Sequence, residues 1–321
     1  APNRMGFATK RPRSGAAWRD GVDANGLVIG GLGGNVDIAK GVLVNGSIGA
    51  VSYDSNATAI RLGSGARSDT IQIGGVVGAS GSSKEGTAAR GLVIDSGATV
   101  SNLVVGGTVA AAALDDEKGT AIAILDSSGT VSSLKNTGAI TASGGAANIA
   151  IDMSANSSGV TLSQSLASET AKAPQITGDI RLGSGNDNVT VSAGTITGDL
   201  ALGGGNDSLS LSGASRLTGD TSFGTGSASL TLSDTAAIVG AIDFGGGSGT
   251  LTMEGTSSLS GAINNAGGMV KLALAPRGEI EKALKKFYGV GAETLEELED
   301  DDDDTFDIFF DEDKEITEGD Q

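Results

Sequence analysis

One short phrase recurs five times in the C-terminal half of this chain: an aliphatic residue, a small residue, glycine, one further residue and a second, usually apolar, residue. The copies are Ile176–Ile180, Ile196–Leu200, Leu217–Thr221, Ile238–Ile242 and Leu259–Ile263. Their starting positions differ by 20, 21, 21 and 21 residues. A fixed period of this length indicates a solenoid, because one copy is too short to enclose a core and can bury its apolar side chains only against neighbouring copies.

A second phrase lies between these copies and consists of a glycine-rich turn followed by alternating apolar and small polar residues. Its copies are 182–191, 202–211, 223–232 and 244–253. Alternation with a period of two places apolar side chains on one face of a strand and hydroxyls on the other. The sequence therefore predicts two short strands per copy, joined by glycine turns, and no helix in this region.

The upstream region repeats this architecture more loosely. Val93, Leu103 and Val109 match Ile124, Leu134 and Ile140 at an offset of 31 residues. The extra residues of these longer coils fall in polar stretches at 78–86 and 115–119, and insertions into solenoids are expected in loops.

We therefore expect an all-β protein in which residues 21–272 form roughly nine or ten coils, of about 20–32 residues each, of a parallel β-helix. Parallel crossover connections are almost always right-handed, so the β-helix is expected to be right-handed.

Composition restricts the chemistry that the chain can perform. The sequence contains 53 Gly but only 4 Pro, as turns in a solenoid require, and it has no Cys and no His. Thiol nucleophiles, imidazole bases and nearly all zinc sites are therefore excluded. The sequence predicts that the protein is not an enzyme and has no catalytic residue, bound cofactor or metal ligand.

Two glycine-rich segments resemble nucleotide-binding loops only in part. The segment Gly78–Glu85 contains Lys84 but lacks the Gly-Lys-Ser/Thr ending of a phosphate loop, and the segment Gly31–Val36 departs from the dinucleotide fingerprint at its last position. Both segments are interpreted as turns.

Asp187 and Asp207 carry the one pattern typical of a metal site. Each lies in a Gly-x-Gly-Asn-Asp turn that resembles the calcium-binding nonapeptide of repeats-in-toxin proteins. Those sites need copies about 9 or 18 residues apart, whereas these two are 20 apart. We therefore favour turn residues that bond their own backbone, and calcium binding by Asp187 and Asp207 stays open as the alternative.

A second set of carboxylates follows glycine on successive coils. Asp179, Asp199 and Asp220 could form a ladder like that of sugar-cleaving β-helices. Stacked at strand spacing they would repel one another without positive neighbours, so we expect solvated turn residues.

The two ends of the chain carry opposite charges. Residues 1–20 are predicted to be a basic tail, 273–298 a short helical segment and 299–321 an acidic, disordered tail that contributes much of the net charge of −18. The chain has no hydrophobic signal segment and begins at Ala1, which fits a processed product. No apolar run reaches the length of a transmembrane helix.

The repeats of residues 21–272, most clearly 176–180 and 182–191, resemble the passenger domain of bacterial autotransporters, which use type V secretion. The resemblance implies a secreted or outer-membrane-associated adhesin at the cell surface. A surface glycan or protein would be its ligand, and a translocator barrel in the parent protein its partner. It implies no binding to nucleic acid.

Residues 270–321 are similar instead to the end of the N-terminal domain and the acidic linker of type II secretion and type IV pilus assembly ATPases. This resemblance implies a second function, a cytoplasmic fragment or fusion of secretion machinery that docks a partner through its C-terminal segment. A third, a β-helix polysaccharide lyase or hydrolase, is disfavoured because His, aromatic residues and an acid/base pair are lacking.

Overall fold

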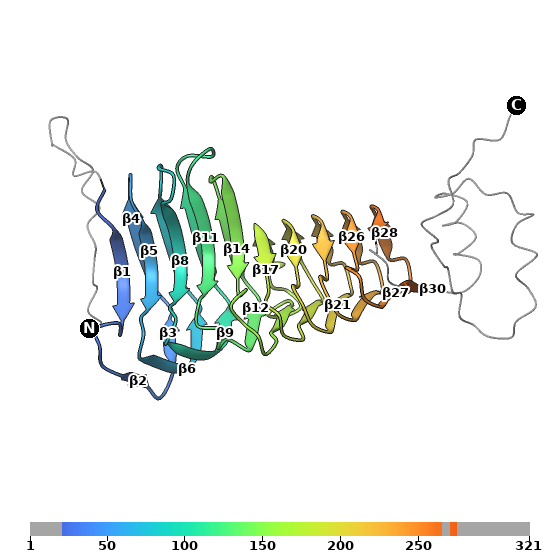
Figure 1. Ribbon diagram of the computed structural model, residues 1–321, viewed down its shortest axis with the longest axis horizontal. Helices are drawn as coiled ribbons and strands as arrows, with labels where there is room; N and C mark the ends of the chain where they lie inside the picture. Colours follow the sequence, from blue (N-terminus) through green and yellow to red (C-terminus); the bar gives the residue numbers. More distant parts are fainter. Residues whose placement is uncertain (1–20, 265–269, 275–321) are drawn as a thin grey trace, which may run out of the picture.

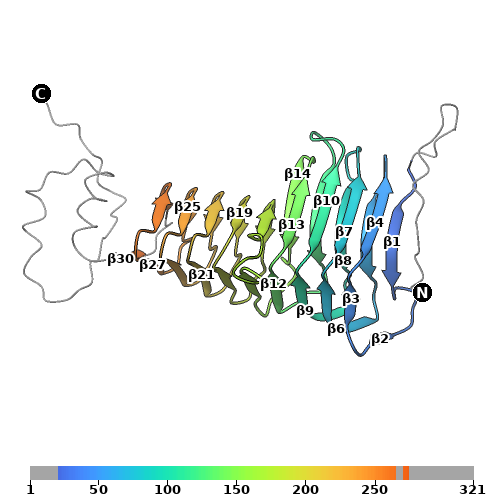
Figure 2. The same ribbon diagram turned by 180° about the vertical axis from the view of Figure 1, so that it is seen from behind.

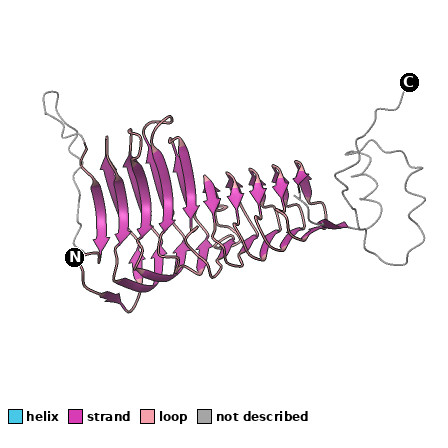
Figure 3. Ribbon diagram, in the orientation of Figure 1, coloured by secondary structure: helices cyan, strands magenta, loops and turns pink. Residues whose placement is uncertain are grey.

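The structure is a computed structural model that describes residues 21–264 and 270–274. Every regular element in these ranges is a β-strand, as Figure 3 shows. The tails predicted at 1–20 and 299–321 lie outside the described residues, as does most of the helical segment predicted at 273–298. Its first two residues, Ala273 and Leu274, belong to the last described strand.

The strands form three parallel sheets, which we name A, B and C. Sheet A contains β1 (Ala24–Ile29), β5 (Ala57–Leu62), β8 (Ala88–Ile94), β11 (Thr120–Asp126), β14 (Ala147–Asp152), β17 (Asp179–Arg181), β20 (Leu200–Ala201), β23 (Thr221–Ser222), β26 (Ile242–Asp243) and β29 (Ile263–Asn264). Sheet B contains β2 (Val36–Ile38), β3 (Val42–Val44), β6 (Ala66–Ile73), β9 (Thr99–Val105), β12 (Ser133–Asn136), β15 (Thr161–Gln164), β18 (Asn188–Val191), β21 (Asp207–Leu211), β24 (Ala228–Leu232), β27 (Gly249–Met253) and β30 (Val270–Leu274). Sheet C contains β4 (Ser47–Ser52), β7 (Val76–Gly81), β10 (Thr108–Ala113), β13 (Ala139–Ser143), β16 (Gln175–Thr177), β19 (Thr195–Thr197), β22 (Arg216–Thr218), β25 (Ala237–Val239) and β28 (Ser258–Ser260).

Each coil visits the three sheets in the order A, B, C, and each strand pairs with the equivalent strands of its neighbouring coils, on both sides except at the ends of the sheets. This is the topology of a parallel β-helix, and the ten strands of sheet A agree with the expected number of coils. Figure 1 shows the strands stacked along one long axis, and Figure 2 shows the molecule from behind, where strands β4, β7, β10 and β13 of sheet C are labelled.

The predicted period sets the register of the C-terminal coils. Ile196 pairs with Ile176 on one side and with Leu217 on the other, in sheet C. Leu209, from the second phrase, pairs with Val189 in sheet B. The columns of equivalent residues are buried in the interior, so the stacking of apolar side chains predicted from the period is confirmed.

Each short coil contains three strands, so the prediction of two is wrong. The first phrase is divided at its glycine, which turns the chain from sheet C into sheet A. At Gly198 φ is +132°, and a Cβ there would lie 2.5 Å from the carbonyl oxygen of Gly178 in the preceding coil. Only glycine fits this corner without strain, so the phrase belongs to two sheets instead of one strand.

The longer N-terminal coils differ from the prediction in where their extra residues lie. The stretch 115–119 is a loop as expected, but residues 78–81 continue strand β7, and only 82–87 form a loop. In sheet A, β8 has 7 residues whereas β20 has 2. Much of the extra sequence therefore widens the sheets, and Figure 1 shows the wide N-terminal and narrow C-terminal parts.

One register predicted for the N-terminal coils is wrong by one residue. Ile124 pairs with Leu92 and not with Val93. As a result Asp126 stands opposite Ile94, at an interior position where it is 1% exposed. Its carboxylate accepts hydrogen bonds from the backbone amides of Ser128 and Val131, so a polar side chain occupies an otherwise apolar column.

The interior is filled mainly by aliphatic side chains, with one aromatic stack. The rings of Phe223 and Phe244 lie on successive coils, parallel to within 1° and 5.3 Å apart. In the first coil, Leu27 and Ile29 are only partly buried, because the described residues place a coil on one side of them only. Stacking on both sides is therefore what completes the burial of each coil.

Adding one methyl group to a glycine at the corner between sheets C and A is expected to destabilise the fold. At Gly219, φ is +144° and a Cβ would lie 2.1 Å from the carbonyl oxygen of Gly198. We expect Gly219→Ala to lower the free energy of unfolding by about 1 kcal/mol or more, measured by chemical denaturation. Gly46→Ala is the control, because a Cβ there meets nothing within 4 Å. Equal effects of the two substitutions would contradict the corner assignment.

The assignment of inner and outer faces can be tested on one coil. Ile196 is 1% exposed, so Ile196→Asp buries a carboxylate and is expected to cost on the order of 4 kcal/mol of stability. Asp199 is exposed, and its Oδ1 accepts a bond from the amide of Asp220 at 2.9 Å. Asp199→Asn keeps this acceptor and should change stability by no more than about 0.5 kcal/mol. Similar losses from both variants, measured by chemical denaturation, would refute the assignment.

Candidate functional site

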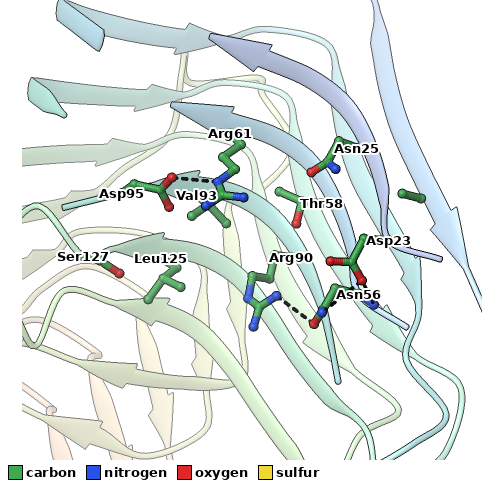
Figure 4. A pocket seen from close by; sticks show the side chains of 11 residues that line it. Asp23, Asn25, Asn56, Thr58, Arg61, Arg90, Val93, Asp95, Leu125 and Ser127 are labelled. Carbon is green, nitrogen blue, oxygen red and sulfur yellow. Dashed lines mark hydrogen bonds and ion pairs between the residues drawn. The ribbon is translucent and has the colours of Figure 1, made fainter. Parts of the chain in front are cut away.

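The outer face of sheet A carries a groove across the first coils, shown in Figure 4. Its cavity volume is about 310 Å³. The residues that line it are Asp23, Ala24, Asn25, Asn56, Thr58, Arg61, Arg90, Val93, Asp95, Leu125 and Ser127. Strands β1, β5, β8 and β11 carry most of them, and equivalent positions such as Thr58 and Arg90 stand side by side on neighbouring strands. The groove thus combines charged, amide, hydroxyl and aliphatic groups on a rigid surface.

A hydrogen-bond chain crosses three coils along one side of the groove. Asp23 Oδ1 accepts from the backbone amide of Asn56 at 3.1 Å and from its Nδ2 at 3.2 Å. Asn56 Oδ1 in turn accepts from the amide of Ala88 at 3.0 Å and from Nη1 of Arg90 at 3.1 Å. This chain fixes the orientation of the Asn56 amide and, through it, one edge of the Arg90 guanidinium.

The charges of the groove differ in how well they are compensated. Arg61 Nε lies 2.7 Å from Asp95 Oδ2 in an ion pair. The hydrogen bond from Ser55, with those from Asn56, holds the pKa of Asp23 below its ordinary value. Burial lowers the pKa of Arg90, which makes no ion pair with any described residue. Arg90 is thus a partly buried cation whose hydrogen-bond partner among the described residues is the neutral amide of Asn56.

The groove continues into a neighbouring cavity of about 540 Å³. Asn25, Arg61 and Asp95 line both cavities, and the second adds the apolar side chains of Val28 and Leu32. Leu32 is 99% exposed. The two cavities therefore form one extended surface with a polar part and an apolar part.

Sequence reasoning missed this groove. Thr58 of one coil pairs with Arg90 of the next, and Arg61 with Val93, so the lining residues recur at the coil period of 32. That spacing is visible in the sequence, but the upstream repeats are degenerate and a register error of one residue exchanges the inner and outer faces.

Asp187 and Asp207 are stacked on successive coils and are buried, at 2% and 3% exposure. Asp187 Oδ1 accepts from the amide of Val160 at 2.6 Å, and Asp207 Oδ1 accepts from the amide of Asp187 at 2.8 Å. The Oδ2 atom of each has no hydrogen-bond partner. Burial, with the neighbouring charge of Asp207, raises the pKa of Asp187 to about 6, and burial also raises that of Asp207.

The expectation that these Asn-Asp turns bond their own backbone is wrong, because their bonds run between coils. Asn186 Oδ1 accepts from the amide of Asn206 in the next coil at 2.8 Å, while the aspartates bond the preceding coil. The described residues contain no group of three or more Asp, Glu, His or Cys side chains that could hold a metal ion. The carboxylates of Asp187 and Asp207 are thus a buried pair and not part of a larger ligand cluster.

Asp179, Asp199 and Asp220 do stack in a ladder, but amides stabilise it. Asp199 accepts a hydrogen bond from the amide of Asp220, and Asp220 from the amide of Ala241, at 2.9 and 2.8 Å. Asp179 also has a positive neighbour, contrary to expectation, because its Oδ2 lies 3.6 Å from Nη2 of Arg181. The ladder supports the corner between sheets C and A.

The two segments that partly resemble nucleotide loops have different structures. Residues 31–34 lie in an irregular turn between β1 and β2, as expected. Residues 78–81 lie in β7, and Lys84, in the following loop, has its Nζ 3.5 Å from Asp54 Oδ2. The interpretation of the segment 78–85 as a turn is therefore correct only for the residues after 81.

No protein-family profile, curated protein or solved structure matches this sequence significantly. In the part of the chain that the structure describes, no helix is long and apolar enough to span a membrane.

The buried aspartate pair predicts an unusual dependence of stability on pH. Asp187 keeps its proton in the folded protein up to about pH 6 but ionises near 3.8 when unfolded. The folded state therefore binds more protons in this window, and its stability falls as the pH rises from about 4 to about 6. Asp187→Asn removes this titration, so it should match the wild type near pH 4 and exceed it by about 1–3 kcal/mol above pH 6. An unchanged slope of unfolding free energy against pH in this variant would contradict the assignment.

Proposed function

We propose that this protein is a non-enzymatic β-helical surface protein, exported as the resemblance to autotransporter passenger domains implies, and that it binds a surface ligand. In this proposal the β-helix is right-handed and is followed by the short helical segment and the acidic tail. The protein would be secreted or held at the cell surface, with a translocator barrel in its parent protein. The ligand would contact the groove on the outer face of sheet A.

The groove is the observation that supports a binding role. It presents hydrogen-bonding groups beside exposed apolar residues, on strands paired on both sides from β5 onward. Of the ten large apolar side chains exposed in the described residues, eight lie between residues 22 and 76. Exposed apolar side chains are therefore concentrated in the N-terminal coils, where the groove lies.

The charged groups of the groove suit binding better than proton transfer. Asp95 is paired with Arg61, and Asp23 accepts several hydrogen bonds. A guanidinium does not lose its proton in proteins, so neither arginine supplies a general base. The groove can hold a ligand in place by charge and hydrogen bonds without any of these residues changing its protonation.

Export can be tested by protease treatment of intact cells that express the natural protein, with immunodetection of the β-helix. We expect the β-helix to be cleaved by added protease or found in the medium, because a passenger domain lies outside the envelope. A cytoplasmic protein serves as the protected control. Protection of the β-helix until lysis would overturn the proposal and favour the secretion-machinery function. Depolymerisation of a polysaccharide by the purified protein would overturn its non-enzymatic part.

A further inference from the structure

We infer that the groove on sheet A binds the carboxylate groups of an acidic polysaccharide, with Arg90 and Arg61 as the anion-binding residues. This inference rests on the proposed binding role of the groove, and it names the chemical class of the ligand. It does not depend on where the protein is located.

Arg90 provides the first argument. Its side chain is partly buried, and its hydrogen bond to a described residue goes to the neutral Oδ1 of Asn56. Asp23 and Asp95 attract it only from beyond ion-pair distance, while Arg61 repels it. A partly buried charge without a close counter-ion is costly. A bound anion would supply the missing partner, and Arg90 retains free donors to receive it.

Arg61 provides the second argument. Only its Nε is engaged by Asp95, at 2.7 Å, so its two Nη groups have no hydrogen-bond partner among the described residues. Its side chain is 50% exposed, and Figure 4 shows it on the same groove as Arg90. Because both guanidinium groups line one groove, each can bind an anionic group of the same ligand.

The remaining lining selects a saccharide among anionic ligands. Asn25 and Ser127 are exposed and offer amide and hydroxyl groups that can hydrogen-bond sugar hydroxyls, and the partly exposed Leu125 supplies aliphatic surface. The two connected cavities provide room for several units of a chain.

Two other polymers fit the groove less well. A nucleic acid needs many cationic contacts along its backbone, whereas only two basic residues, Arg61 and Arg90, line this groove. An extended peptide would gain most from a free strand edge. The central strands β5 and β8 of this surface are already paired on both sides.

The test measures binding of the full chain to immobilised carboxylated polysaccharides, namely polygalacturonate, alginate, hyaluronate and polysialic acid. Methyl-esterified polygalacturonate is the uncharged comparison. Dextran sulfate and poly-L-glutamate separate carboxylated sugars from sulfated sugars and acidic protein. We expect at least one carboxylated polysaccharide to bind more tightly than all three comparison polymers. Arg90→Gln should weaken that binding about tenfold or more, the effect of one charge-assisted hydrogen bond.

Arg216→Gln is the matched control, because it removes the same charge from an exposed position in sheet C. It should bind like the wild type, and circular dichroism should show that both variants are folded. Binding that is equal after esterification, or unaffected by Arg90→Gln, would overturn the inference. Preference for poly-L-glutamate or dextran sulfate would overturn the ligand class. Failure of every polymer to bind would also overturn the inference, whereas the protease result would still decide the export proposed above.

Discussion

Parallel backbone hydrogen bonding between successive coils is the constraint on which the rest of this structure depends. Each strand finds its partners one coil away, so every side chain stands directly above the equivalent residue of the preceding coil, as Ile196 stands above Ile176. Apolar residues therefore form continuous columns. A residue that suits one coil must also suit its two neighbours, which is why Gly198 and Gly219 both occupy the corner where the chain turns closely against the coil before it.

The same constraint decides how polar groups enter the interior. Asn136 is fully buried and donates from Nδ2 to Gln164 Oε1 at 2.8 Å in the next coil. Asp126 is satisfied by the amides of its own turn. The pair Asp187 and Asp207 is less well satisfied, because each carboxylate bonds one amide of the preceding coil and leaves its second oxygen without a partner. At these two positions the stacking supplies one amide donor to each carboxylate and no second.

The accuracy of sequence-based prediction follows the regularity of the repeats. The short coils keep a period of 20 or 21 residues, so the columns through Ile196 and Leu209 could be predicted residue by residue. In the long coils, Leu92 and Val93 are both aliphatic and both buried, so hydrophobicity alone does not decide which pairs with Ile124. The groove was missed for the same reason: Asn56 and Arg61 come from one coil and Arg90 from the next, and only the correct register shows that they share a surface.

Coil width links the fold to the groove. In the C-terminal coils the strands of sheet A are 2 or 3 residues long, which leaves one or two outward side chains per strand. The strands β5 and β8 have 6 and 7 residues, and two residues of each line the groove, Thr58 and Arg61 on β5 and Arg90 and Val93 on β8. Only this wider surface can hold Arg90 and its hydrogen-bond partner Asn56 on one side of the groove, with aliphatic side chains beside them. The longer coils thus provide the broad outer face that carries the groove. The shorter coils extend the apolar interior and present few outward side chains.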